Sequence, residues 1–185
     1  IAVEFFHALT DGRGGILFLI NLIARYLELK YGLAIRREGL LLPLSEPPRE
    51  EELEDSFLKN AAETAAGRAE DRSYRLRGSR ESGGFKHLTT GIVETASLLS
   101  VARDYHVSVT ALLAALMAQS VMDIQAAKRP RSRQRPVKIT IPVDLRRLFD
   151  SQTLRNFSLV LNIGVDPRYG DYSLEELCTV VYHQL

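Results

Sequence analysis

Two segments in which apolar residues alternate with polar or small ones constrain the fold most. They cover residues 137–143 and 157–165, and a period of two predicts half-buried strands that pair within one sheet. Around them, apolar residues recur at helical spacing over 16–30, 94–105 and 109–126. Because strands and helices are interspersed along the chain, the sequence predicts a mixed α/β or α+β protein.

Local signals give the ends of the expected helices. Gly32 is a natural stop for the first helix, and Ser108 can cap the helix over 109–126. Ser173 and Glu176 have the spacing of a capping box that begins a last helix. Apolar side chains on one face of the helix over 94–105 are expected to be buried: Leu98, Val101, Ala102 and Tyr105. The expected core of the helix over 109–126 comprises Leu112, Leu113, Leu116 and Met117.

Two more apolar runs and one polar segment complete the expected elements. Residues 1–7 and 85–93 are each interpreted as a strand. The stretch 43–84 is rich in proline and charge and poor in large apolar groups, which is typical of a linker. Within it, residues 49–66 are expected to form a polar helix.

Composition restricts the class of protein. Hydrophobic residues make up 45% of the 185 and the formal net charge is +1, which favours a soluble globular protein without a general attraction to nucleic acid or membranes. We expect no membrane span, because no apolar run reaches about 18 residues. The single Cys178 excludes an internal disulfide and a cysteine-based zinc cluster, and it fits a cytoplasmic setting. The chain begins at Ile1 in one apolar run and ends at Leu185 in another, so we expect an internal piece of a longer protein.

The residues that point to chemistry are His7, Asp11 and Gly12. Histidine titrates near neutral pH, so an imidazole held by the turn after an apolar segment can take a proton from a hydroxyl or amine. A core histidine bonded to a backbone carbonyl is the alternative for His7, and Asp11 is also placed to cap the following helix. Gly12 is expected to allow a positive φ.

The spacing His7-x-x-x-Asp11-Gly12 resembles the HxxxDG motif of the superfamily that contains chloramphenicol acetyltransferases, peptide-synthetase condensation domains and alcohol acyltransferases. Later segments resemble it as well, closest to alcohol acetyltransferase-like members: residues 107–113, 142–146 and 156–158. Phe6 stands where the longer form of the motif has its first histidine.

The resemblance implies a partial two-layer sandwich with a mixed sheet and packed helices. On that scheme residues 1–42 are the end of an N-terminal half-domain, 43–84 are the polar linker, and 85–185 are part of a C-terminal half-domain.

The same resemblance implies roles for single residues. His7 would be the catalytic base, and Asp11 would pair with an arginine that braces its loop. Arg146 is the candidate partner, because a guanidinium can hold a carboxylate at two points. Candidates for binding the oxyanion or substrate lie on the polar faces of the two expected strands: Thr140, Ser158 and Asn162. The basic run over 128–135 is interpreted as a solvated loop rather than as a site for coenzyme phosphates.

The implied activity is transfer of an acyl group from acyl-coenzyme A to a small-molecule alcohol, with no bound cofactor or metal. A carrier-protein-dependent condensation domain, which forms an amide or ester, is one alternative. A non-catalytic binding domain of the same fold is another, although an intact His7 argues against it. The acceptor alcohol and the oligomeric state do not follow from the sequence.

Overall fold

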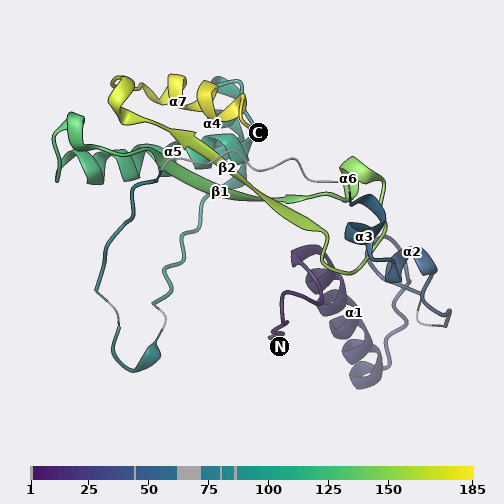
Figure 1. Ribbon diagram of the computed structural model, residues 1–185. Helices are drawn as coiled ribbons and strands as arrows, with labels where there is room; N and C mark the ends of the chain where they lie inside the picture. Colours follow the sequence, from purple (N-terminus) through teal and green to yellow (C-terminus); the bar gives the residue numbers. More distant parts are fainter. Residues whose placement is uncertain (1, 44, 62–71, 80, 86) are drawn as a thin grey trace. The chain divides into compact units, whose positions relative to one another are not determined.

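The computed structural model in Figure 1 describes residues 2–43, 45–61, 72–79, 81–85 and 87–185. The chain divides into two compact units, and each is built from two separate stretches of sequence. Unit 1 comprises Ile1–Ala66 and Pro142–Val160, and unit 2 comprises Gly67–Ile141 and Leu161–Leu185.

The longest helix of unit 1 is α1 (Gly12–Tyr31), which begins four residues earlier than its apolar pattern predicts. Asp11 caps its N-terminus, and Gly32 ends it with a φ of 64° and an N–H that donates to the carbonyl of Glu28. A left-handed conformation costs glycine little, so the predicted stop at this position is confirmed.

Two short helices replace the single polar helix expected over residues 49–66. They are α2 (Glu50–Leu53) and α3 (Ser56–Asn60). The break has a local cause, because the Asp55 carboxylate accepts from the N–H of Leu58 at 3.1 Å and so starts a new helix. The carbonyl of Glu54 accepts instead from the Thr153 hydroxyl at 2.6 Å. Residues 62–66 of the expected helix lie outside the described part of the chain.

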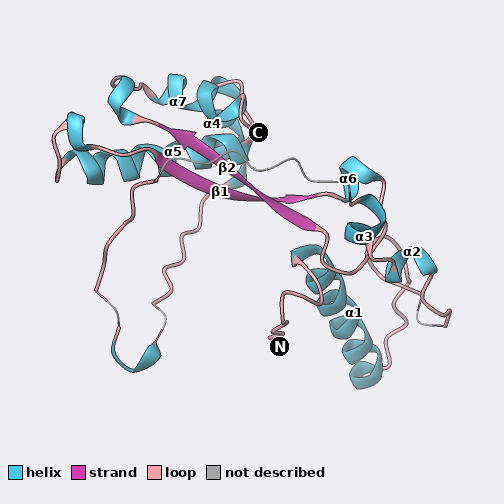
Figure 2. Cartoon of the chain, in the orientation of Figure 1, coloured by secondary structure: helices cyan, strands magenta, loops and turns pink. Residues whose placement is uncertain are grey.

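The two alternating segments form strands β1 (Val137–Asp144) and β2 (Ser158–Val165), which pair as a two-stranded antiparallel sheet (Figure 2). This pairing confirms the prediction drawn from their period of two. The short helix α6 (Arg146–Phe149) follows β1 directly. Helices and this small antiparallel sheet make the chain an α+β protein at the coarse level.

Unit 2 owes its core to three helices and the strand segments beside them. They are α4 (Thr95–Asp104), α5 (Val109–Ala126) and α7 (Leu174–Tyr182). The bounds of α5 and its Ser108 cap confirm the prediction, as does the capping box of Ser173 and Glu176 on α7. Three short 3-10 turns complete the described elements: η1 (Ser82–Gly84), η2 (Arg131–Arg133) and η3 (Pro167–Tyr169).

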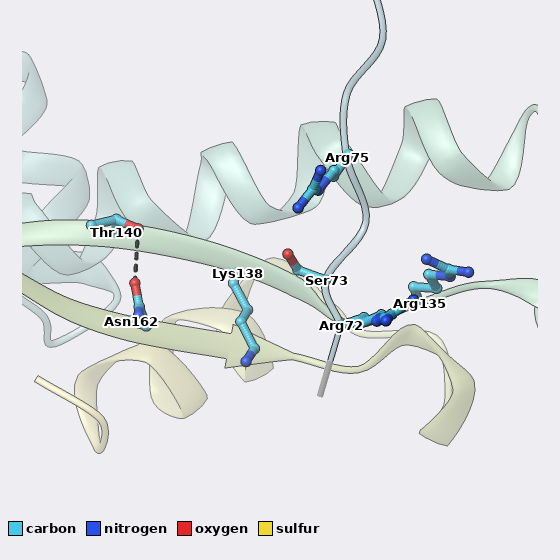
Figure 3. A pocket seen from close by; sticks show the side chains of 7 residues that line it. All are labelled: Arg72, Ser73, Arg75, Arg135, Lys138, Thr140 and Asn162. Carbon is cyan, nitrogen blue, oxygen red and sulfur yellow. Dashed lines mark hydrogen bonds between the residues drawn. The ribbon is translucent and has the colours of Figure 1, made fainter. Parts of the chain in front are cut away.

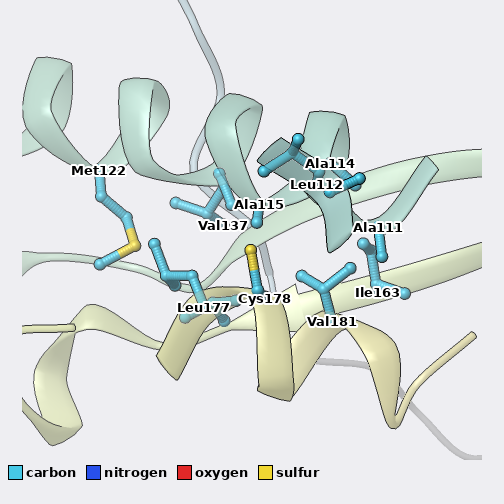
Figure 4. Close-up of a cluster of buried hydrophobic side chains, with 13 residues drawn as sticks. Ala111, Leu112, Ala114, Ala115, Met122, Val137, Ile163, Leu177, Cys178 and Val181 are labelled. Carbon is cyan, nitrogen blue, oxygen red and sulfur yellow. The ribbon is translucent and has the colours of Figure 1, made fainter. Parts of the chain in front are cut away.

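The buried face of α5 differs from the expected one. Leu112 is 1% exposed as predicted, but Leu113 is 45% exposed, and Leu116 and Met117 are exposed too. The core of unit 2 takes mainly small side chains from α5: Ala111, Ala114, Ala115 and Ala118. Figure 4 shows Cys178 and Val181 of α7 directed toward this row. Alanines let two helices approach closely, so the helix turns its small residues rather than its large ones to the core. On α4, Ala102 is buried, whereas Val101 is exposed, against expectation.

Two predicted strands are wrong in the described residues. Neither 2–7 nor 87–93 forms a strand there. Phe6 is 74% exposed and Ile92 is 96% exposed, so these apolar segments are not buried either. A strand is stabilised by hydrogen bonds to a neighbouring strand, and neither segment has such a neighbour among the described residues.

One described helix bears on the expectation that the chain does not span a membrane. At 18 residues and a mean hydropathy of 1.4, α5 meets the length and composition of a membrane span. Core helices of soluble proteins meet the same two criteria. The absence of a span therefore stays a prediction.

Candidate active site

A buried polar cluster in unit 1 is centred on the carboxylate of Asp11. Its Oδ1 accepts from the N–H groups of Arg13 and Gly14 at 3.1 and 3.3 Å, which satisfies the first turn of α1. Its Oδ2 accepts from Arg146 Nη1 at 2.7 Å and from the N–H of Phe157 at 2.9 Å. Asp11 therefore caps the helix and pairs with the predicted arginine at the same time.

Arg146 is the partner that the sequence predicted, and the predicted salt bridge is confirmed. The residue is 3% exposed, and its guanidinium donates to four acceptors. Two are the carboxylates of Asp11 and Asp144, at 2.7 and 2.8 Å. The other two are the carbonyls of Thr153 and Arg155, at 2.7 and 2.6 Å. One side chain thus fixes the start of α1, the end of β1 and the loop before β2.

The charges within this cluster compensate for their burial. Burial opposes ionisation of Asp11, but the hydrogen bonds from Arg146, Phe157 and Gly14 outweigh it, and the pKa of the carboxyl is lowered. Burial likewise opposes the charge on Arg146, and the two carboxylates more than offset it, so the pKa of the guanidinium is raised. The pKa of Asp144 is lowered because the bonds from Arg146 overcome its own desolvation. The oxygens of Asp11 and the N–H groups of Arg146 are nearly all hydrogen-bonded. The attraction between the two charges can therefore offset the cost of removing both from water.

The glycine that this loop requires is Gly14 and not Gly12, which corrects the expectation for Gly12. Gly12 is the first residue of α1, is not among the residues with positive φ, and has open space where a Cβ would be. A Cβ on Gly14 would come within 2.0 Å of Thr10 Oγ1 and 2.4 Å of the carbonyl oxygen of Leu154. Thr10 Oγ1 donates to that same carbonyl at 2.8 Å. The helix start and the loop before β2 therefore touch at a point where only a hydrogen fits.

His7 lies in the turn just before α1, where the N–H of Leu9 donates to the carbonyl of Phe6 at 2.9 Å. Its side chain is exposed, and no described residue forms a hydrogen bond with the imidazole. The alternative of a core histidine bonded to a carbonyl is therefore wrong. His7 lines an open hollow of about 360 Å³ together with Thr10, Asp11 and Gly12. The imidazole is thus accessible, on a loop that Asp11 and Arg146 fix four residues away.

The three candidates for oxyanion or substrate binding are divided between the units. Ser158 belongs to unit 1, and its hydroxyl donates to Asn156 Oδ1 at 3.1 Å. Thr140 and Asn162 belong to unit 2, where the Thr140 hydroxyl donates to Asn162 Oδ1 at 2.8 Å (Figure 3). The structure therefore brings two of the three, Thr140 and Asn162, into direct contact within unit 2.

Several residues that hold the loop were not found from the sequence. Thr153 is 1% exposed and connects the loop before β2 to Glu54, and the Ser151 hydroxyl lies 2.7 Å from that of Ser56. Leu154 N–H donates to the carbonyl of Glu52 at 2.8 Å. Polar residues in a loop give no periodic signal, so only their contacts show this role. Gly14 did have a signal. Glycine destabilises a helix relative to alanine, so a glycine in the first turn suggests that close packing requires it.

No three histidine, cysteine, aspartate or glutamate side chains gather to hold a metal ion in the part of the chain that the structure describes. Comparison with protein-family models, with curated proteins and with solved structures found no significant match to this chain.

Proposed function

We propose that this chain carries the catalytic loop of an acyltransferase that moves an acyl group from acyl-coenzyme A to an alcohol, with His7 as general base. The observation that carries the proposal is the difference between the two polar members of the motif. Asp11 is buried and fully occupied by Arg146 and backbone N–H groups, whereas His7 is exposed on the same loop. A rigid support beneath an accessible imidazole is what general base catalysis needs.

The proposed reaction has two proton transfers and no covalent enzyme intermediate. His7 takes the proton from the acceptor hydroxyl as the alcohol oxygen attacks the thioester carbonyl carbon. The tetrahedral intermediate then collapses, the C–S bond breaks, and the imidazolium returns the proton to the leaving thiolate. The products are an ester and free coenzyme A, and no cofactor or metal takes part in these steps. Ser158 of unit 1 is a candidate donor to the oxyanion, and to serve that role its hydroxyl would leave Asn156 Oδ1, to which it donates in the structure.

The proposal includes a fold, a partner set and a location. The fold is the two-layer acyltransferase sandwich, of which the paired β1 and β2 and the packed helices would be a part. The partners are a small alcohol and acyl-coenzyme A, without nucleic acid, and the setting is the cytoplasm. The pair of Asp11 and Arg146 supports this assignment, because the resemblance implies an arginine partner for this aspartate.

Release of free thiol tests the proposal. The full-length gene product that carries these residues is incubated with acetyl-coenzyme A and a panel of short-chain and aromatic alcohols, and thiol is followed with a chromogenic disulfide. Alcohol-dependent thiol release supports the proposal. A matched reaction with the acyl group on a carrier protein separates the two donor types. Absence of transfer from both donors, to alcohols and amines alike, would leave the non-catalytic binding domain.

A further inference from the structure

Unit 2 contains a polar hollow that the proposed acyl transfer does not use. It has a volume of about 770 Å³, within the range of small-molecule sites. Figure 3 shows its lining, which comes from a segment before α4, from the approach to β1 and from both strands. The lining residues share a cationic or hydrogen-bonding side chain: Arg72, Ser73, Arg75, Arg135, Lys138, Thr140 and Asn162.

We infer that this hollow binds a small molecule carrying two or more phosphate groups. The first argument is charge. Four of its lining side chains are cationic, and none of the described residues that line it is a carboxylate. Arg72, Arg75 and Arg135 are exposed, and none of the ion pairs between described residues engages these three. Cationic side chains that lie near one another repel, and a bound anion relieves that repulsion.

The second argument is the geometry of the donors. A guanidinium presents two parallel N–H groups, which match two phosphate oxygens, and three such groups can serve more than one phosphate. On the sheet, Thr140 donates to Asn162 Oδ1, so the Asn162 amide turns its oxygen toward Thr140 and keeps its NH₂ group as a donor. Arginine and asparagine donors therefore converge on one hollow from different elements.

The third argument is that backbone contacts hold the arginine-bearing segments. Tyr74, between Ser73 and Arg75, donates its N–H to the carbonyl of Pro136 at 2.8 Å. Gln125 is 0% exposed, accepts from the N–H of Arg135 at 2.7 Å and donates to its carbonyl at 3.0 Å. These bonds fix the backbone of Arg75 and Arg135 while their side chains remain exposed, so the donors are partly preorganised.

The lining favours a small molecule over a nucleic acid. Single-stranded nucleic acids bind where bases can stack on aromatic side chains, and none of the described residues that line this hollow is aromatic. A hollow of about 770 Å³ lined by hydrogen-bond donors suits compact phosphate groups better than an extended nucleic-acid backbone. The inference does not rest on His7, because none of the described residues that line the hollow belongs to the loop that carries His7.

Titration calorimetry with inorganic pyrophosphate tests the inference on the full chain. We expect saturable binding of one pyrophosphate, with Arg75→Gln and Arg135→Gln each weakening it about tenfold or more, because each removes a charge-assisted contact. The matched controls are Arg77→Gln and Arg133→Gln, which remove the same charge two residues away from exposed positions outside the hollow. Both controls should bind within about twofold of the wild type. Asn162→Asp is a second probe. It places a carboxylate among the groups that would donate to phosphate, so the affinity for pyrophosphate should fall.

Parallel titrations separate the sources of the phosphate groups. ADP or coenzyme A binding more tightly than pyrophosphate, with the same loss in Arg75→Gln, would identify a nucleotide-bearing ligand. Equal affinities would identify a free polyphosphate, and both results support the site. The inference is overturned if neither pyrophosphate nor ADP binds, or if the control variants lose as much affinity as the site variants. Tighter binding of a single-stranded oligonucleotide that depends equally on all four arginines would overturn it as well.

Discussion

At the scale of single residues, the two polar side chains His7 and Asp11 differ sharply in burial although only three residues separate them. His7 is exposed and without a described hydrogen-bond partner, and Asp11 is buried with four. The motif by itself does not say which of its polar residues supports the loop and which reacts. Burial and hydrogen bonding separate the two roles.

The first prediction concerns the salt bridge. Arg146→Ala leaves the Asp11 carboxylate buried without its cation and frees the carbonyls of Thr153 and Arg155, so it should destabilise the protein by about 3–5 kcal/mol. Asp11→Asn should also destabilise, because an amide cannot accept at all the positions the carboxylate serves. Urea unfolding measures both changes. Arg147→Ala is the matched control, since this adjacent arginine is exposed and should cost about 0.5 kcal/mol or less. Equal losses of unfolding free energy in Arg146→Ala and Arg147→Ala would contradict a stabilising role for the salt bridge between Asp11 and Arg146.

The second prediction separates two glycines of the same loop. Gly12→Ala should be neutral or stabilise by about 0.5–1 kcal/mol, because alanine has the higher helix propensity and the space is open. Gly14→Ala should destabilise by about 1–3 kcal/mol, because its methyl group would meet Thr10 and the Leu154 carbonyl. Melting temperatures of the two variants give the comparison directly. If Gly12→Ala is the more damaging change, the close contact at Gly14 does not exist in solution.

At the scale of elements, the sequence predicted the helices and strands whose apolar residues recur at helical or strand spacing. The helices α1, α4, α5 and α7 and the strands β1 and β2 were all found from periodicity and caps. The apolar runs at 2–7 and 87–93 were not strands, because a run of apolar residues predicts burial only if a neighbour exists to cover it. The predicted buried face of α5 was wrong. The large leucine side chains suggested that they form the core, but α7 packs closely against α5 on the face that carries the alanines.

The third prediction tests that face of α5. Leu112→Ala should destabilise the protein by about 2–5 kcal/mol, because its side chain is 1% exposed and its removal leaves a cavity. Leu113→Ala is the matched control on the next residue, and at 45% exposure it should cost under about 1 kcal/mol. Chemical denaturation of both variants measures the difference. A larger loss from Leu113→Ala would favour the core that the sequence suggested.

At the scale of the whole molecule, the candidate site could be predicted in part. The pairing of Asp11 with Arg146 was expected from the motif, although 135 positions separate the two residues. The contributions of Thr153, Arg155 and Ser151 were not expected, because they come from loop backbone and hydroxyl groups that carry no sequence pattern. The hollow around Arg75 and Arg135 was also missed, since it joins residues of separate segments that look like ordinary solvated charge.

The fourth prediction concerns acid. The folded pKa values of Asp11 and Asp144 lie below their ordinary value of 3.8, so these groups contribute stability that is fully present above about pH 4. That contribution is lost as the pH falls through the lowered pKa values, because the folded state must then take up protons that weaken its bonds to Arg146. Unfolding free energy measured from pH 7 to pH 2 should fall steeply in the wild type below about pH 4. Asp11→Asn should flatten this dependence, and an unchanged slope would contradict a lowered pKa for Asp11 in the folded protein.

The proposed function requires that His7 is the general base, and that Asp11 and Arg146 hold its loop without any contribution from the imidazole. The most direct test is the rate of acyl transfer by His7→Ala in the full-length gene product, measured at the same folded concentration as the wild type. Loss of a positioned general base should lower the rate by roughly a hundred- to ten-thousand-fold. The melting temperature should stay nearly unchanged, because the imidazole is exposed and has no hydrogen-bond partner among the described residues. A His7→Ala protein that retains more than about a tenth of the wild-type rate would remove His7 from the mechanism.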